Sequence, residues 1–125
     1  MSAMPQAQWT PPAMLLELAA GDAELIPGVV AAFQEDTASR LTAARSALSS
    51  ADRPRLRKEL HSIKGGARQL GADSFAALCQ QIELAALEAP ASQLAGWMTG
   101  LEAQFHDLCL AMTRHFGSSE SSAKQ

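Results

Sequence analysis

Apolar residues recur along this chain at intervals of three and four, the spacing that places side chains on one face of an α-helix. Such stripes run through four segments of the chain. They comprise Val29, Val30, Phe33, Thr37, Leu41, Ala44 and Leu48; Leu56, Leu60, Ile63, Ala67 and Leu70; Phe75, Leu78, Cys79, Ile82 and Ala86; and Leu94, Met98, Leu101, Phe105, Leu108 and Met112. The pattern predicts four amphipathic helices.

Proline and glycine mark where the first helices begin and end. Pro11 and Pro12 are placed to open a short helix that runs to about Ala20, where Gly21 ends it. Proline cannot lie deep inside a helix, because its ring removes a backbone donor and collides with the preceding turn. The second helix is therefore expected to begin near Pro27.

The remaining helix boundaries are predicted in the same way. A third helix is expected from Arg53 to about Leu70, with Gly71 stopping it and Asp73 or Ser74 capping the fourth. Pro90 then separates the fourth helix from the last one.

The chain divides into one folded unit and two polar ends. Residues 1–10 form a proline-containing lead-in that is expected to be flexible, and residues 117–125 form a serine-rich tail with too little apolar content to fold. Residues 11–116 are predicted to form an all-α domain, an antiparallel four-helix bundle with a short additional N-terminal helix.

Composition narrows the classes of function. The chain has 125 residues and a formal net charge of -3, so no general basic surface is available for nucleic acid. It has neither an apolar run long enough for a bilayer nor a basic-then-apolar leader, and a cytoplasmic protein without membrane contact is expected. Cys79 and Cys109 lack CxxC spacing, which predicts free thiols and no metal site.

His61 is the strongest candidate for chemistry. At about 100° per residue it points roughly 140° away from the centre of the stripe formed by Leu56, Leu60, Ile63, Ala67 and Leu70, so its imidazole is expected to face water. Arg57, Lys64 and Arg68 lie within about 60° of it on the same side of the helix. An unperturbed imidazole has a pKa near 6.5 and is partly uncharged, hence nucleophilic, at neutral pH.

Gly65 and Gly66 follow within the same predicted helix. Each costs a helix interior roughly 0.5–1 kcal/mol relative to alanine, although the apolar stripe continues through them. Bare backbone above His61 would let another protein approach the imidazole closely. Together with the basic flank, this arrangement predicts a site for a phosphoryl group; for Gly66, close helix packing is a second interpretation.

These residues resemble the histidine-containing phosphotransfer (HPt) domains of two-component signalling. The signature of that family is matched by His61, Lys64, Gly65, Gly66, Ala67, Leu70 and Gly71. Residues 75–83 also resemble the next helix of the family, and the resemblance covers about residues 12–116.

The resemblance implies that His61 accepts a phosphoryl group, Lys64 assists and Gly65 provides clearance. Arg57, Arg68 and Gly66, which surround His61 on the same helix, are expected to belong to the partner-docking surface. It also implies transfer from a receiver-domain phosphoaspartate to the aspartate of a response regulator. The partners would be receiver domains, a hybrid sensor histidine kinase, or both. The chain itself would need no cofactor, because Mg²⁺ would belong to the receiver, and it is expected to be a monomer without an autonomous catalytic site.

Other interpretations remain open at this point. The string from His61 to Ala67 also resembles the phosphoacceptor domain of chemotaxis histidine kinases, whose donor would be an ATP-binding kinase domain. A helical adaptor that is never phosphorylated and a hydrolase that uses His61 as nucleophile or base are further alternatives. Glu83 falls where some HPt domains place a polar partner of the histidine, but a solvated surface carboxylate is the preferred interpretation of this residue.

Overall fold

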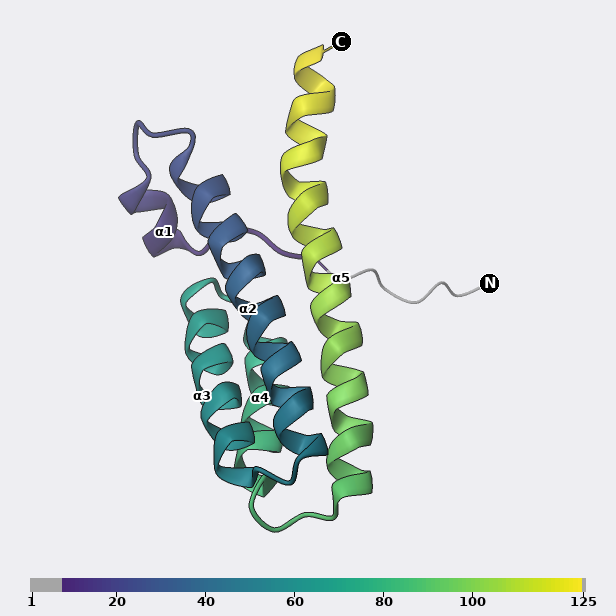
Figure 1. Cartoon of the computed structure of the whole chain (residues 1–125). Helices are drawn as coiled ribbons and strands as arrows, with labels where there is room; N and C mark the ends of the chain where they lie inside the picture. Colours follow the sequence, from purple (N-terminus) through teal and green to yellow (C-terminus); the bar gives the residue numbers. More distant parts are fainter. Residues whose placement is uncertain (1–7, 125) are drawn as a thin grey trace.

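The chain folds into four long helices that alternate in direction, with a short fifth helix at one end (Figure 1). The computed structural model describes the backbone of residues 8–124 and the side chains of residues 8–116. The helices are α1 (Ala13–Leu18), α2 (Leu25–Ser49), α3 (Arg53–Gln69), α4 (Asp73–Ala85) and α5 (Ala91–Lys124). The predicted all-α class and the antiparallel bundle with a short N-terminal helix are confirmed.

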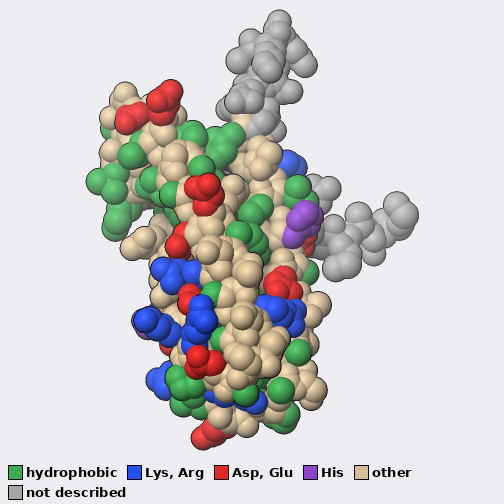
Figure 2. Space-filling view, in the orientation of Figure 1, with side chains coloured by type: hydrophobic (Ala, Val, Ile, Leu, Met, Phe, Trp, Pro, Cys, Tyr) green, Lys and Arg blue, Asp and Glu red, His purple; other side chains and the backbone are tan. Residues whose placement is uncertain are grey.

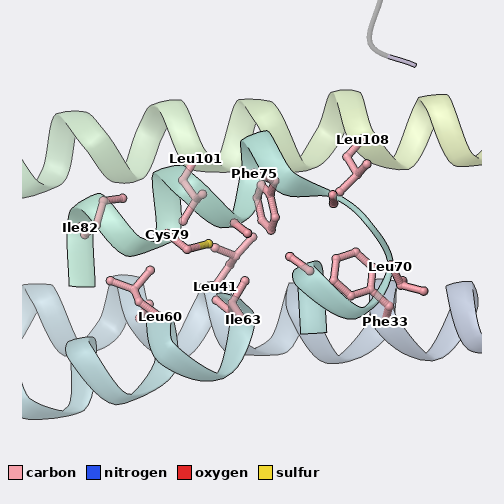
Figure 3. Close-up of a cluster of buried hydrophobic side chains, with 14 of the residues drawn as sticks. Phe33, Leu41, Leu60, Ile63, Leu70, Phe75, Cys79, Ile82, Leu101 and Leu108 are labelled. Carbon is pink, nitrogen blue, oxygen red and sulfur yellow. The ribbon is translucent and has the colours of Figure 1, made fainter. Parts of the chain in front are cut away.

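Each long helix packs against two others in a closed ring. Helix α3 lies between α2 and α4, and α5 packs against the same two helices from the other side. The predicted stripes meet inside this ring, where Leu41, Ile63, Cys79 and Leu101 are among the buried side chains (Figure 3). The apolar faces therefore form a single core, and α3 presents its opposite face to solvent.

The turns on either side of α3 are set by local chemistry. The Asp52 carboxylate accepts a hydrogen bond from the backbone N–H of Arg55 at 3.2 Å, which caps the N-terminus of α3. Gly71 ends the helix with φ 71°, and a Cβ at this position would lie 3.2 Å from Pro12. Gly71 thus supplies both the left-handed conformation and the space that the turn into α4 requires.

The fourth helix begins differently from the sequence-based expectation. Ala72 occupies the N-cap position, and no side chain caps α4, so the prediction of Asp73 or Ser74 as the cap is wrong. The tight turn at Gly71 brings the chain into helical conformation at Asp73. The negative charge of Asp73 lies in the first turn, where it interacts favourably with the positive end of the helix dipole.

The N-terminal lead-in is ordered where the structure describes it. Trp9 is buried, and its indole N–H donates a hydrogen bond of 2.7 Å to the backbone carbonyl of Leu70. Its ring also makes an edge contact with His115, with centroids 5.6 Å apart. The prediction of flexibility is therefore wrong for Trp9, whose indole joins the end of α3 to α5; residues 1–7 lie outside the described residues.

Helix α5 continues past the end expected for it. It reaches Lys124 instead of stopping near Phe116, so the tail predicted to be disordered over 117–125 is helical as far as Lys124. One interior glycine, Gly117, costs the helix only about 0.5–1 kcal/mol relative to alanine. Extending an existing helix also avoids the cost of nucleating a new one.

Within residues 8–124, none of the helices combines the length and the apolar character needed to cross a membrane.

Candidate functional site

His61 lies near the middle of α3, on the face turned away from the core. Leu60 and Ile63 on either side of it are buried, whereas the His61 side chain is 69% exposed. The position follows from the helical period, because the residues that pack into the core leave His61 on the opposite side. The exposure expected from the sequence is therefore present.

A carboxylate from the neighbouring helix contacts the imidazole. Glu83 Oε2 of α4 lies 2.9 Å from His61 Nδ1, and Glu83 Oε1 lies 2.7 Å from Lys64 Nζ. The side chains of Glu83 and Lys64 are only 12% and 13% exposed. Glu83 therefore joins the histidine and the lysine through its two oxygens, in a place where water has little access.

The protonation of Glu83 follows from these contacts. Burial alone would raise the pKa of its carboxyl group, but the contact with Lys64 and its positive charge, together with the hydrogen bond from His61, outweigh burial and lower that pKa. The carboxylate is ionised at neutral pH and can only accept hydrogen bonds. In the contact with His61 the proton consequently belongs to Nδ1, which leaves the lone pair of a neutral ring on Nε2.

The two glycines after Lys64 have different surroundings. A Cβ built on Gly65 would meet nothing within 4 Å, so the surface beside His61 is open there. A Cβ on Gly66 would lie 3.6 Å from the Phe33 ring of α2, an ordinary packing distance. The clearance role of Gly65 stays a prediction, with which this open space is compatible, and Gly66 lies at the contact between α3 and α2.

The site thus combines an exposed histidine, a fixed hydrogen-bond partner at its Nδ1 and open backbone beside it. This arrangement is suited to the transfer of a small chemical group between proteins. The family model of the Hpt domain matches residues 28–114 of this chain. The chain belongs to the Hpt domain family. Hpt domains carry phosphoryl groups in phosphorelays and are not catalysts in their own right, so this protein functions in histidine phosphotransfer.

A solved structure supports the same fold. The chain is similar to histidine-containing phosphotransfer protein B (HptB) from Pseudomonas aeruginosa PAO1, with a TM-score of 0.72 and 24% sequence identity. The match covers 84% of this chain and 92% of that chain. No curated protein sequence matches the chain.

The basic residues that flank His61 on this Hpt domain differ in whether they already have a hydrogen-bond partner within the protein. Arg68 donates a hydrogen bond of 2.7 Å from Nη2 to Gln80 Oε1 on α4. Arg57 is exposed and has no ion pair among the described side chains, as is also true of Lys58 beside it. Lysine and arginine gather over α3 on the face seen in Figure 2. Arg57 is thus available to a partner, whereas Arg68 is held against α4.

An apolar groove opens beside the same helix. It has a volume of about 580 Å³ and lies where α1 meets α2 and α3. Met14 and Leu18 of α1 line it and are largely exposed, while Phe33 and Gly66 are among the residues that line the rest. Gly66 therefore contributes both to helix packing and to the wall of this groove.

Glu83 is the site residue that sequence reasoning assigned wrongly. A solvated surface carboxylate was the preferred interpretation, but the side chain is mostly buried between His61 and Lys64. The stripe of α4 gives one clue, because Glu83 follows the buried Ile82 and lies one turn after the buried Cys79. That spacing places Glu83 at the edge of the core face, where a side chain can reach the neighbouring helix.

Proposed function

We propose that His61 is the phosphoacceptor of this Hpt domain, and that it takes the phosphoryl group from a receiver-domain phosphoaspartate and passes it to the aspartate of a second receiver. The observation that carries the proposal is the pairing of an exposed imidazole with a buried carboxylate at Nδ1, 2.9 Å away. This contact orients the ring and leaves Nε2 as the nucleophilic nitrogen.

The other two histidines are less suited to the role. His106 is exposed on α5 and has no hydrogen-bond partner among the described side chains. His115 makes edge contacts with the aromatic rings of Trp9 and Phe116. Neither is followed by lysine and glycine at the third and fourth positions, as His61 is.

The chain's part in the transfer is positioning. Phosphoryl transfer requires an in-line arrangement and stabilisation of charge, with little covalent chemistry left to the protein. His61 supplies the nucleophile, Gly65 leaves room for the partner, and Lys64 contributes positive charge near the ring. The Mg²⁺ and the acidic pocket would come from the receiver, and this chain would hold no cofactor.

For docking, we assign the groove lined by Met14, Leu18, Phe33 and Gly66 to an apolar surface of the receiver domain. Two observations support this occupant: the groove includes Gly66, which follows the open Gly65, and Arg57 offers a charge for the acidic surroundings of a receiver's aspartate. Leu18→Ser should therefore weaken binding to a receiver. Leu110→Ser, which changes another exposed leucine on α5, should leave receiver binding unchanged.

Two parallel labelling reactions test the proposal. The protein is incubated with a panel of phosphorylated receiver domains, and separately with a chemotaxis-type kinase domain and ATP, and acid-labile label is followed. Label from receivers alone supports the relay described above, and label from the kinase alone would favour the chemotaxis-type alternative. No label in either reaction, with receiver binding unaffected by His61→Ala, would favour an unphosphorylated adaptor.

A further inference from the structure

The short helix α1 makes little contact with the core of the bundle. None of residues 13–18 is buried, and Leu15 alone among them packs partly against the core. The helix nevertheless supplies Met14 and Leu18 to the groove beside α3. The position of this wall of the groove therefore depends on how the chain is anchored next to α1.

Trp9 anchors the chain shortly before α1 begins. Its buried indole donates a hydrogen bond of 2.7 Å to the backbone carbonyl of Leu70, at the end of α3, where a helix has carbonyl groups without donors of its own. The same ring contacts His115 and Phe116 of α5, with centroids 5.6 Å and 6.3 Å apart. One side chain thus fixes the chain to both α3 and α5.

This anchor lies next to the groove. Pro12, the N-cap residue of α1, follows Trp9 by three positions and packs against Gly71, where an added Cβ would lie 3.2 Å from the proline ring. Leu70 lies one helical turn beyond Gly66, which lines the groove. Trp9 and Pro12 therefore hold the start of α1 beside the last turn of α3.

Building on the proposed docking of a receiver in this groove, we propose that Trp9 is a positioning residue for phosphotransfer. It holds α1 against the end of α3, so that Met14 and Leu18 are in place before a receiver arrives. A surface that is already ordered binds its partner at a smaller entropic cost than one that is ordered by binding. The imidazole of His61 is oriented from α4, so its chemistry does not depend on α1.

The decisive variant is Trp9→Ala in the full chain. When α1 is released, only the fraction of molecules with α1 in place can bind, so we expect the receiver concentration for half-maximal transfer to rise on the order of tenfold. The rate at saturating receiver should stay close to wild type. Labelling by phosphoramidate should also be unchanged, because this small donor does not use the groove. Hydrogen exchange, followed by mass spectrometry, should become faster over residues 13–18.

Two further variants separate an effect through α1 from a general loss of stability. Trp97→Ala removes the other tryptophan, which packs partly against the core from α5, and should leave both the receiver dependence and the exchange of residues 13–18 unchanged. Leu18→Ser should weaken receiver binding in the wild-type background and add little to Trp9→Ala, in which this wall of the groove is already displaced. Full additivity of the two changes would overturn the inference about Trp9.

A milder variant covers the case in which Trp9→Ala does not fold. Trp9→Phe retains an aromatic ring and loses only the N–H donor, and we expect the half-maximal receiver concentration to rise by up to about fivefold, the equivalent of one net hydrogen bond. An unchanged half-maximal concentration in both folded variants, or unchanged exchange over residues 13–18, would overturn the inference about Trp9. Failure of wild type to accept label from any receiver would contradict the proposed function instead.

Discussion

The Nδ1 atom of His61 and the Glu83 carboxylate, which are 22 residues apart in the chain, lie 2.9 Å from each other across the contact between α3 and α4. The antiparallel packing of these helices makes the contact possible, because it brings the middle of α3 level with the later part of α4. An exposed histidine thereby acquires a fixed ring orientation. Several measurable consequences follow from this cluster and its surroundings.

Lys64 contributes charge and not a bond, so its removal should slow transfer without abolishing it. We expect Lys64→Ala to reduce the rate of phosphoryl transfer by on the order of tenfold, about the effect of one lost charged contact. Rapid-quench labelling from a phosphorylated receiver measures the rate. Lys58→Ala on the exposed face of the same helix is the matched control, and an equal loss of rate in that variant would argue that only general positive charge matters.

Gly65 should matter for the approach of the partner protein to His61 and not for the stability of the fold. Because a side chain there meets no neighbour, Gly65→Leu should raise the free energy of unfolding by up to about 1 kcal/mol through better helix propensity. The same change should slow transfer by about tenfold or more, since the partner can no longer reach the correct position. Gly96→Leu, an equally open helical position on α5, should stabilise the fold and leave transfer intact. Unimpaired transfer in Gly65→Leu would contradict the clearance role.

The contacts among His61, Lys64 and Glu83 should also affect how the stability of the fold depends on pH in the acid range. The pKa of Glu83 is lowered in the folded protein, so its stabilising contribution is fully present above the ordinary carboxyl pKa of about 4.3 and is lost as the pH falls through the folded-state value. The unfolding free energy of wild type should therefore decline more steeply over this acid range than that of Glu83→Gln. Urea unfolding at a series of pH values measures both curves, and parallel curves would contradict the assignment.

The two cysteines should differ in reactivity. Burial, and then the negative charge of Glu83, raise the pKa of the Cys79 thiol to about 12, whereas Cys109 is only partly buried. Since the thiolate is the reactive form, Cys79 should resist a thiol reagent in the folded protein and react once the chain is unfolded. Mass spectrometry after brief labelling distinguishes the two sites. Rapid modification of Cys79 in the native protein would show that the packing between α3 and α4 opens readily.

Local periodicity explains why so much of the fold is predictable from the sequence. The stripes that end in Leu70 and Met112 are properties of single helices, and they also place His61, Lys64 and Gly65 on the solvent side of α3. Contacts between segments are not encoded in this way. The bond from Trp9 to the Leu70 carbonyl and the one between His61 and Glu83 depend on how helices pack and on their relative register. From the sequence alone Glu83 is therefore interpreted as a surface residue, and its contacts become evident only when α4 is placed beside α3.

The proposal that His61 carries the phosphoryl group is tested most directly by labelling three variants in parallel. His61→Gln, His106→Gln and His115→Gln are each incubated with a phosphorylated receiver that labels wild type, and acid-labile label on this chain is quantified. We expect no label on His61→Gln and labelling close to wild type on the other two. Because the His61 side chain is solvent-exposed, helix content and melting temperature should be little changed. Label on a folded His61→Gln protein would contradict the assignment of His61 as the phosphoacceptor.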